Sequence, residues 1–307
     1  MEKAKKTSRA NTTEQEFRRL LQQAPKDWHS ARQLLRFLRL NKLRRSDVVL
    51  QFGPNLLAKH ASALGDEVWT VREQVFEASL DVGALNEAEE LLRQLQKQFP
   101  NSRRVERLKG MMKEAEGDLG AAREIFDAII EEEPTDAITM KRRICLHKAS
   151  KETRDQAIKE LNDYLKVFMA DTDAWQELGD LYLDQQQYEY AAFCYEELIL
   201  ADPFNYHFHN RYAEILFTLG DHVTARKYFA QSLELNNENN ARAMFGLCIC
   251  SKAIDSKKGG GAKADKDSNG QLFQHGRNAL LAKYTEKAQN SSLELEVVTA
   301  ALNKMAP

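Results

Sequence analysis

Residues 172–205 read TDAWQELGDLYLDQQQYEYAAFCYEELILADPFN, and the spacing of small and large side chains in this stretch predicts two packed helices. Gly179 and Ala191 are small residues at the positions where the first helix would cross the second. Tyr195 is large enough to fill the gap between successive helix pairs, and Pro203 ends the second helix. The stretch therefore indicates one unit of a stack of helix pairs.

The same pattern of small and large residues recurs along the chain every 34 or 35 residues. A small residue is followed four positions later by a large one at five places: Ala88 and Leu92, Ala122 and Phe126, Ala157 and Leu161, Ala191 and Tyr195, and Ala225 and Phe229. These columns predict five repeats, at about 69–102, 103–136, 137–171, 172–205 and 206–239. The period, together with Trp175 and Gly179 in the quoted copy, resembles the tetratricopeptide repeat.

Strand signals are nearly absent, so we expect an all-α protein. Its core would be a right-handed superhelical solenoid of tetratricopeptide repeats over residues 46–250. Residues 1–45 would form a basic, partly flexible helical region. Residues 255–271 are rich in Gly and Lys and predict a flexible loop. Residues 272–304 have helical periodicity and would cap the open end of the solenoid.

Helix-start signals divide the N-terminal region further. A capping box at Thr13 predicts a helix that ends near Gln23. Either Asp27 or Ser30 would open a second helix. A third helix would be kinked or broken at Pro54.

Composition and charge exclude several classes of protein. The 307 residues are 43% hydrophobic and 29% charged, which is typical of a globular chain. No run approaches the roughly 18 apolar residues of a membrane span, and the first residues lack the apolar core of a signal peptide. Four cysteines are too few for a disulfide framework. Residues 1–45 carry a net charge of +9 and the remainder −11, so a basic arm on an acidic body could contact phosphate, anionic lipid or an acidic partner.

No catalytic or metal-binding motif passes a geometric test. His207 and His209 are two positions apart on a predicted helix, about 200° around its axis, and cannot share a metal. Cys248 and Cys250 fail the same test, and buried inert thiols are the simpler interpretation. The glycines of residues 259–263 lack the Gly-Lys-Ser/Thr ending of a phosphate loop. We therefore expect no enzymatic activity, no cofactor and no metal.

Binding along the inner face of the solenoid is the better interpretation. Positions 2, 5, 9 and 12 of each repeat point into a groove lined by the first helix of each pair. The candidate partner-binding residues are Arg104, Arg107, Met111, Lys141, Lys148, Asp173, Gln176, Asp180, Asn210 and Glu214. This lining changes from basic to acidic and would suit an extended peptide with charges of both signs. The alternative interpretation of each residue is an ordinary solvated face.

A carboxylate clamp of the kind found in tetratricopeptide co-chaperones is a less suitable interpretation. Lys141 and Arg211 could contribute cations to such a clamp. Cys145 and Glu177 stand where asparagines are needed, and His207 stands where a lysine is needed. Glu177 would repel the carboxylate of the bound tail, so we do not favour this function.

Five stretches go beyond a generic repeat: LGDEVW at 64–69, QFPNSRRVERLKGM at 98–111, AAFCYEEL at 191–198, ARKYFAQSLELN at 225–236 and RAMFGL at 242–247. Together they resemble the family of subunit 2 of the endoplasmic reticulum membrane protein complex, also called tetratricopeptide repeat protein 35. The resemblance covers about residues 60–250. Residues 1–45 and 256–270 diverge from the family pattern, so the resemblance implies nothing about contacts made by the N-terminal region.

The resemblance implies a non-catalytic scaffold on the cytoplasmic face of the endoplasmic reticulum, attached peripherally through its partners. Its complex would insert tail-anchored and multipass membrane proteins. The subunit would hold cytosolic tails of membrane subunits in its groove and carry a globular cytosolic subunit on another face. A free cytosolic tetratricopeptide adaptor or co-chaperone that binds extended peptides is the alternative. Nucleic-acid binding is not expected, because the body of the chain is acidic.

Overall fold

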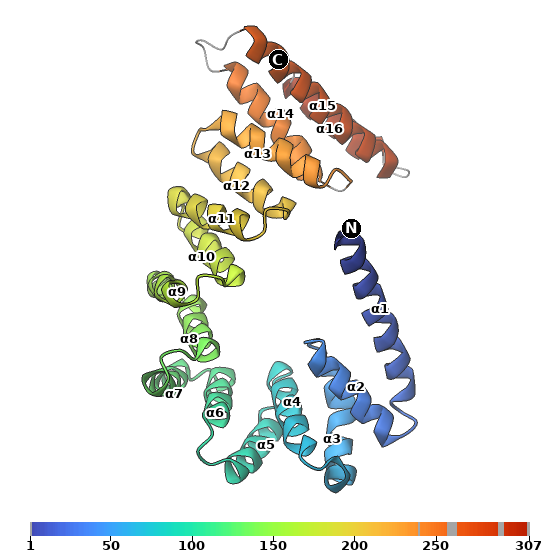
Figure 1. The fold of residues 1–307 in the computed structure, drawn as a ribbon, viewed down its shortest axis with the longest axis vertical. Coiled ribbons are helices and arrows are strands. Elements are labelled where there is room, and N and C mark those ends of the chain that lie inside the picture. The colour runs from blue at the N-terminus through green and yellow to red at the C-terminus, as the bar shows by residue number, and fades with distance from the viewer. Residues whose placement is uncertain (1, 239, 257–262, 288–291, 306–307) are drawn as a thin grey trace. The chain divides into compact units, whose positions relative to one another are not determined.

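The computed structural model describes residues 2–238, 240–256, 263–287 and 292–305, and these residues form helices with no strand among them (Figure 1). The prediction of an all-α fold is confirmed. The helices are α1 (Glu2–Gln23), α2 (Trp28–Leu40), α3 (Ser46–Leu64), α4 (Glu67–Asp81), α5 (Leu85–Gln98), α6 (Arg103–Glu116), α7 (Leu119–Glu132), α8 (Ala137–Ala149), α9 (Arg154–Val167), α10 (Thr172–Asp184), α11 (Tyr188–Ala201), α12 (Tyr206–Thr218), α13 (His222–Leu235), α14 (Ala241–Ser256), α15 (Lys263–Lys287) and α16 (Ser292–Met305).

The chain divides into two compact units, Met1–Leu146 and His147–Pro307. Within each unit, helices that follow one another in sequence pack against each other, as α6 does on α7 and α12 on α13. This division differs from the predicted boundaries at residues 45 and 250. The first three helices share a buried cluster with α4 of the first repeat, and α15 and α16 share one with α13 and α14.

The small residues of the repeat lie at the crossings of the helices. All five alanines of the small-residue column are completely buried: Ala88, Ala122, Ala157, Ala191 and Ala225. The large residues of the second column are buried as well: Leu92, Phe126, Leu161, Tyr195 and Phe229. A side chain larger than a methyl group would have no room at the alanine positions without separating the two helices.

Glycines allow three aromatic rings to lie directly against a helix backbone. A methyl group on Gly110 would overlap the ring of Phe126, and one on Gly246 would lie 2.5 Å from the ring of Phe229. A methyl group on Gly179 would lie 3.0 Å from Tyr195. Tyr195 thus packs on the first helix of its own pair, and its buried cluster also includes Tyr212 and Ile215 of the next pair, as expected of a side chain between pairs.

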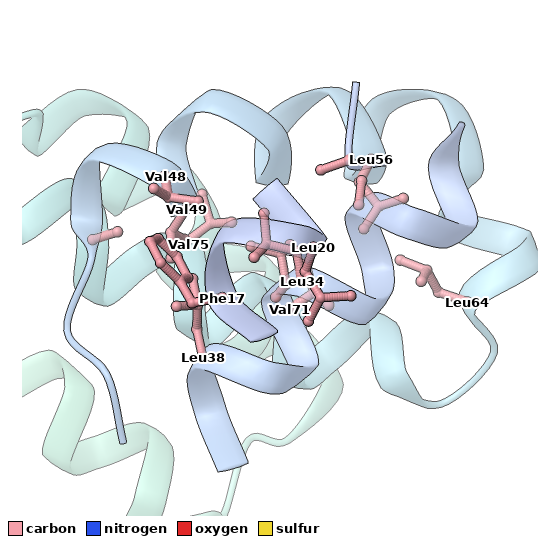
Figure 2. Close-up of a cluster of buried hydrophobic side chains, with 14 of the residues drawn as sticks. Phe17, Leu20, Leu34, Leu38, Val48, Val49, Leu56, Leu64, Val71 and Val75 are labelled. Atoms are coloured by element: carbon pink, nitrogen blue, oxygen red, sulfur yellow. The ribbon is translucent and has the colours of Figure 1, made fainter. Parts of the chain in front are cut away.

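The N-terminal helices are part of the first unit's core (Figure 2). Phe17 and Leu20 of α1 pack in one buried cluster with Leu34 of α2 and Val71 of α4. The carboxylate of Asp27 accepts a hydrogen bond from the backbone N–H of Ser30 at 2.8 Å, so Asp27 is the cap of α2. Helix α1 begins at Glu2, eleven residues before the predicted start, because the capping-box residues continue a helix that already exists.

Pro54 does not interrupt α3, contrary to the prediction. The adjacent Gly53 lies against the side chain of Val75 on α4. The backbone instead leaves helical geometry at His60, with φ −130° and ψ 18°. The His60 ring stacks on Trp28, with 5.2 Å between ring centroids.

The C-terminal region differs most from its prediction. Helix α14 continues through Ser256 and α15 begins at Lys263, so residues 263–271 of the predicted loop are helical; residues 257–262 lie outside the described residues. Helix α15 packs on α14 as the second helix of a sixth pair. A methyl group on Gly276 would lie 2.7 Å from the carbonyl oxygen of Met244, so Gly276 is the small residue of that crossing. It lies well beyond the position that a 34-residue period specifies, which is why the period did not reveal it.

Candidate functional site

The second unit has a hollow of about 400 Å³ beside the first helix of the fourth repeat, α10. Its lining comes from the end of α8 and one face of α10: Lys148, Asp173, Gln176, Glu177, Asp180, Leu181 and Asp184. We call it the acidic hollow, because four carboxylates face one ammonium group. Four of the predicted groove residues meet here, namely Lys148, Asp173, Gln176 and Asp180.

Contacts within the acidic hollow position its carboxylates. Lys148 forms an ion pair with Glu177. Asp180 accepts a hydrogen bond from the hydroxyl of Tyr195 at 3.0 Å, which joins the hollow to the buried packing column of the repeat. Burial, together with this carboxylate, raises the pKa of Tyr195, so the phenol stays protonated and continues to donate. Asp173 is exposed. Asp184 and Asp180 also lie 3.5 Å from Arg154 and 3.9 Å from Arg211, which are outside the lining. The lining itself therefore carries four carboxylates and one ammonium group.

Asn210 and Glu214 of the predicted groove are not part of this hollow. Asn210 is only 3% exposed and donates a hydrogen bond to Asn240 at 2.8 Å, so it faces the next helix pair and not the groove. Asn240 in turn donates to Ser232 and caps α14. Glu214 is occupied by Arg211 at 3.3 Å and by Arg242. The structure thus brings Asp173, Gln176 and Asp180 together on α10 and places Asn210 in a buried polar cluster beside α12.

The first unit has a hollow of similar size and opposite charge. It measures about 410 Å³ and lies among the connection from α2 to α3 and the helices α4, α6 and α8. Its cations are Arg39, Lys42, Arg44, Arg45, Arg104 and Arg142. Its anions are Glu73, Glu77 and Asp81. We call it the basic hollow; of the predicted groove residues, it contains Arg104 and Met111.

Ion pairs fix the walls of the basic hollow. Arg104 pairs with Glu73 at 2.7 Å between Nε and Oε1. The Nε of Arg44 donates to Asp81 at 2.8 Å, and this guanidinium holds the pKa of the Asp81 carboxyl below its usual value. Among the lining residues the cations outnumber the anions, but Arg39, Arg45 and Arg142 also pair with carboxylates outside the lining, namely Glu67, Asp47 and Glu114.

The remaining predicted residues of the first unit lie outside the basic hollow. Arg107 is largely buried and lies 3.6 Å from Asp136. Lys141 is half-buried on α8. Sequence reasoning missed the contribution of α4, although Thr70, Glu73 and Glu77 occupy positions 2, 5 and 9 of the first predicted repeat. Applying the spacing of positions 2, 5 and 9 to that repeat would have identified these three residues. The cations of the α2–α3 connection lie outside the repeats, so this spacing could not identify them.

The nucleophile and metal candidates of the sequence lie in ordinary packing environments. Burial raises the pKa of Cys194 and Cys250 to about 12 and that of Cys248 to about 11, so these thiols stay protonated at neutral pH. His209 is buried, with Nε2 at 2.8 Å from the carbonyl oxygen of Pro203. The described residues contain no group of three metal-ligating side chains. The chemistry that both hollows offer is electrostatic recognition of charged segments.

No helix in the described part of the chain is both long and apolar enough to cross a lipid bilayer.

A comparison with solved structures supports the fold. The C-terminal part of a TPR repeat-containing protein from Cytophaga hutchinsonii has a TM-score of 0.57 to this chain, covering 89% of this chain and 99% of that one. The sequences are 12% identical, so the similarity concerns the fold alone. The tetratricopeptide-like architecture predicted from the 34-residue period is confirmed.

Comparisons of sequence identify the family. The model of the EMC2 TPR-like repeat domain matches residues 91–235. ER membrane protein complex subunit 2-A of Xenopus laevis is 41% identical over 244 residues, which are 78% of this chain and 82% of that protein. The ER membrane protein complex subunit 2 of Dictyostelium discoideum is 36% identical over 69% of this chain and 67% of its own length. With this identity over most of both lengths, the chain belongs to the family of ER membrane protein complex subunit 2.

Proposed function

We propose that the chain is a non-catalytic scaffold subunit of an endoplasmic reticulum membrane protein complex. It lies on the cytoplasmic face of the membrane, attached through partner subunits, and supports the insertion of tail-anchored and multipass proteins. The observation that carries the proposal is the 41% identity to ER membrane protein complex subunit 2-A of Xenopus laevis over 82% of that protein.

The two hollows supply the means of attachment in this proposal. A partner segment rich in Lys or Arg binds the acidic hollow, where Asp173 and Asp180 lie. A segment rich in Asp or Glu binds the basic hollow, where Arg104 lies. Charge complementarity of this kind favours the correct partner and repels a segment of the wrong sign. Of the ten candidate groove residues, the proposal keeps the six that line a hollow: Arg104, Met111, Lys148, Asp173, Gln176 and Asp180.

A pull-down from microsomes tests the proposal. The tagged chain is isolated in mild detergent and its partners are identified by mass spectrometry, while intact membranes are washed in parallel with increasing salt. The expected result is a stoichiometric set of membrane subunits, with the chain still on the membranes after the high-salt wash. Recovery of chaperones alone, or release at low salt, would contradict the scaffold and support a free cytosolic adaptor.

A further inference from the structure

The outer side of α11 exposes large apolar side chains. Tyr190 is 61% exposed, Phe193 54% and Leu200 75%, and Phe204, just after the helix, is 74% exposed. The helical residues are spaced by three and seven positions, so they lie on one face. We call these four residues the α11 outer face. Single exposed apolar residues are common on protein surfaces, but a row along one helix is not.

The other second helices carry charges at the equivalent positions. Two positions after the buried alanine, the five repeats have Glu90, Glu124, Lys159, Phe193 and Lys227. Nine positions after it, they have Lys97, Glu131, Lys166, Leu200 and Glu234. The charged members of both columns are exposed. The repeat therefore does not require an apolar residue at either place, and α11 alone departs from the charged pattern at both.

Neighbouring aromatic rings contact two residues of the α11 outer face, Tyr190 and Phe193. The ring of Tyr190 stacks on Tyr182, with 5.2 Å between centroids. Phe193 meets the edge of Trp175 at 6.0 Å, and the indole N–H of Trp175 donates to the carbonyl oxygen of Met169 at 2.9 Å. A rigid aromatic surface loses little conformational entropy when a partner binds, so this arrangement favours binding.

The charges around this face determine the kind of partner. Helix α11 contains Glu189, Glu196 and Glu197 and no basic residue, and Asp202 follows it. A second copy docked through a two-fold axis would place these carboxylates against each other. An anionic bilayer surface would be repelled for the same reason. Basic side chains around an apolar patch would complement the charge.

We propose that the α11 outer face binds a partner protein through an apolar helix or patch flanked by Lys and Arg. The surface belongs to the second helix of its pair, whereas the acidic hollow is lined by the first helix, α10. This site is therefore additional to the hollows, and it does not depend on the proposed scaffold function.

Two designed peptides test the charge and the apolar character of the site. Both are amphipathic helices with the same leucine face; one is flanked by lysines and the other by glutamates. Their affinity for the purified full-length chain is measured by fluorescence anisotropy. We expect the lysine peptide to bind about tenfold more tightly or better, because only its charges complement Glu189 and its neighbours.

The variant Phe193→Lys/Leu200→Glu transfers the residues of α13 to α11, so it retains side chains that the repeat already accommodates. It should weaken binding of the lysine peptide by about tenfold or more, because the apolar centre of the site is lost. The matched control, Lys227→Glu/Glu234→Lys on α13, should bind this peptide as the unmodified chain does. Circular dichroism and thermal unfolding establish that both variants are folded.

Four results would overturn the proposal. The first is equal binding of the two peptides, and the second is unchanged binding to the α11 variant. The third is self-association of the unmodified chain in analytical ultracentrifugation that the α11 variant abolishes, which would assign the face to a second copy. The fourth is binding to phosphatidylserine vesicles that the same variant abolishes, which would assign the face to lipid.

Discussion

The two hollows are formed by the same kind of helix-pair repeat but have opposite charge. In the first unit, six cations and three anions line the hollow; in the second, one cation and four anions do. The buried columns beneath them are alike, with alanine and a large residue in each repeat. The residues that pack the helices together and the residues that set the charge of each hollow therefore occupy different columns of the sequence. Substitutions should alter the packing or the charge without altering the other.

The largest effect is expected where an aromatic ring lies against a glycine. Gly110→Ala should destabilise the protein by about 1–3 kcal/mol, because the added methyl group overlaps the ring of Phe126. Gly179→Ala should cost less, since its methyl group would lie 3.0 Å from Tyr195. Urea unfolding followed by circular dichroism measures both.

Gly270→Ala is the control for these two variants. None of the described residues lies within 4 Å of a methyl group at this position of α15, so the substitution should be neutral or stabilising by up to about 1 kcal/mol. Equal losses of stability in all three variants would show that the close packing of rings on glycines does not cause the destabilisation.

Charge reversal should separate the two hollows. Asp173→Lys/Asp184→Lys should weaken binding of a lysine-rich peptide about five- to tenfold and leave a glutamate-rich peptide unaffected, because only the acidic hollow changes sign. Arg104→Glu in the basic hollow should weaken binding of the glutamate-rich peptide and leave the lysine-rich peptide unaffected. Isothermal titration at low salt measures both. If each variant weakened both peptides, the hollows would not be independent binding sites.

Low pH should reduce the stability of the protein through Asp81, which lines the basic hollow. Its pKa is lowered by the hydrogen bond from Arg44, so its stabilising contribution is complete above the ordinary aspartate pKa near 4. The contribution is lost as the pH falls through the lowered pKa of the folded state. Asp81→Asn should reduce stability at pH 7 by about 1 kcal/mol or less and flatten this part of the pH profile. An unchanged profile between pH 5 and pH 2 (about the range in which paired carboxylates titrate) would exclude Asp81 as a contributor.

The smallest effect concerns a cysteine on the inner helix of the third repeat. Cys145 is exposed, whereas Cys194, Cys248 and Cys250 are buried with raised pKa values. Maleimide at pH 7 should therefore modify Cys145 first, without measurable loss of stability. Mass spectrometry of the labelled protein identifies the site. Prior labelling of a buried cysteine would mean that the helix pairs open readily.

Sequence patterns predicted the fold where structure depends on neighbours at fixed spacing. The alanine and aromatic columns recur every 34 or 35 residues because each helix crossing repeats the same geometry. Asp27 was one of two expected caps of α2, since capping depends on a residue and the N–H groups just after it. The prediction of a loop at 255–271 was wrong for residues 263–271, because Gly and Lys tracts carry no information about the helix on which they pack.

The sequence by itself determined the repeat, its period and the face of α10 that lines the acidic hollow, because these follow from the helical period and from small residues at crossings. Only the tertiary structure decided that Asn210 is buried, that α15 completes a sixth helix pair and that the α2–α3 connection supplies cations to the basic hollow. Whether a side chain is buried or ion-paired depends on the residues that pack against it in the folded protein. Those partners are 28 to 37 positions away for pairs such as Arg142 with Glu114 and Arg44 with Asp81, and no local pattern specifies them.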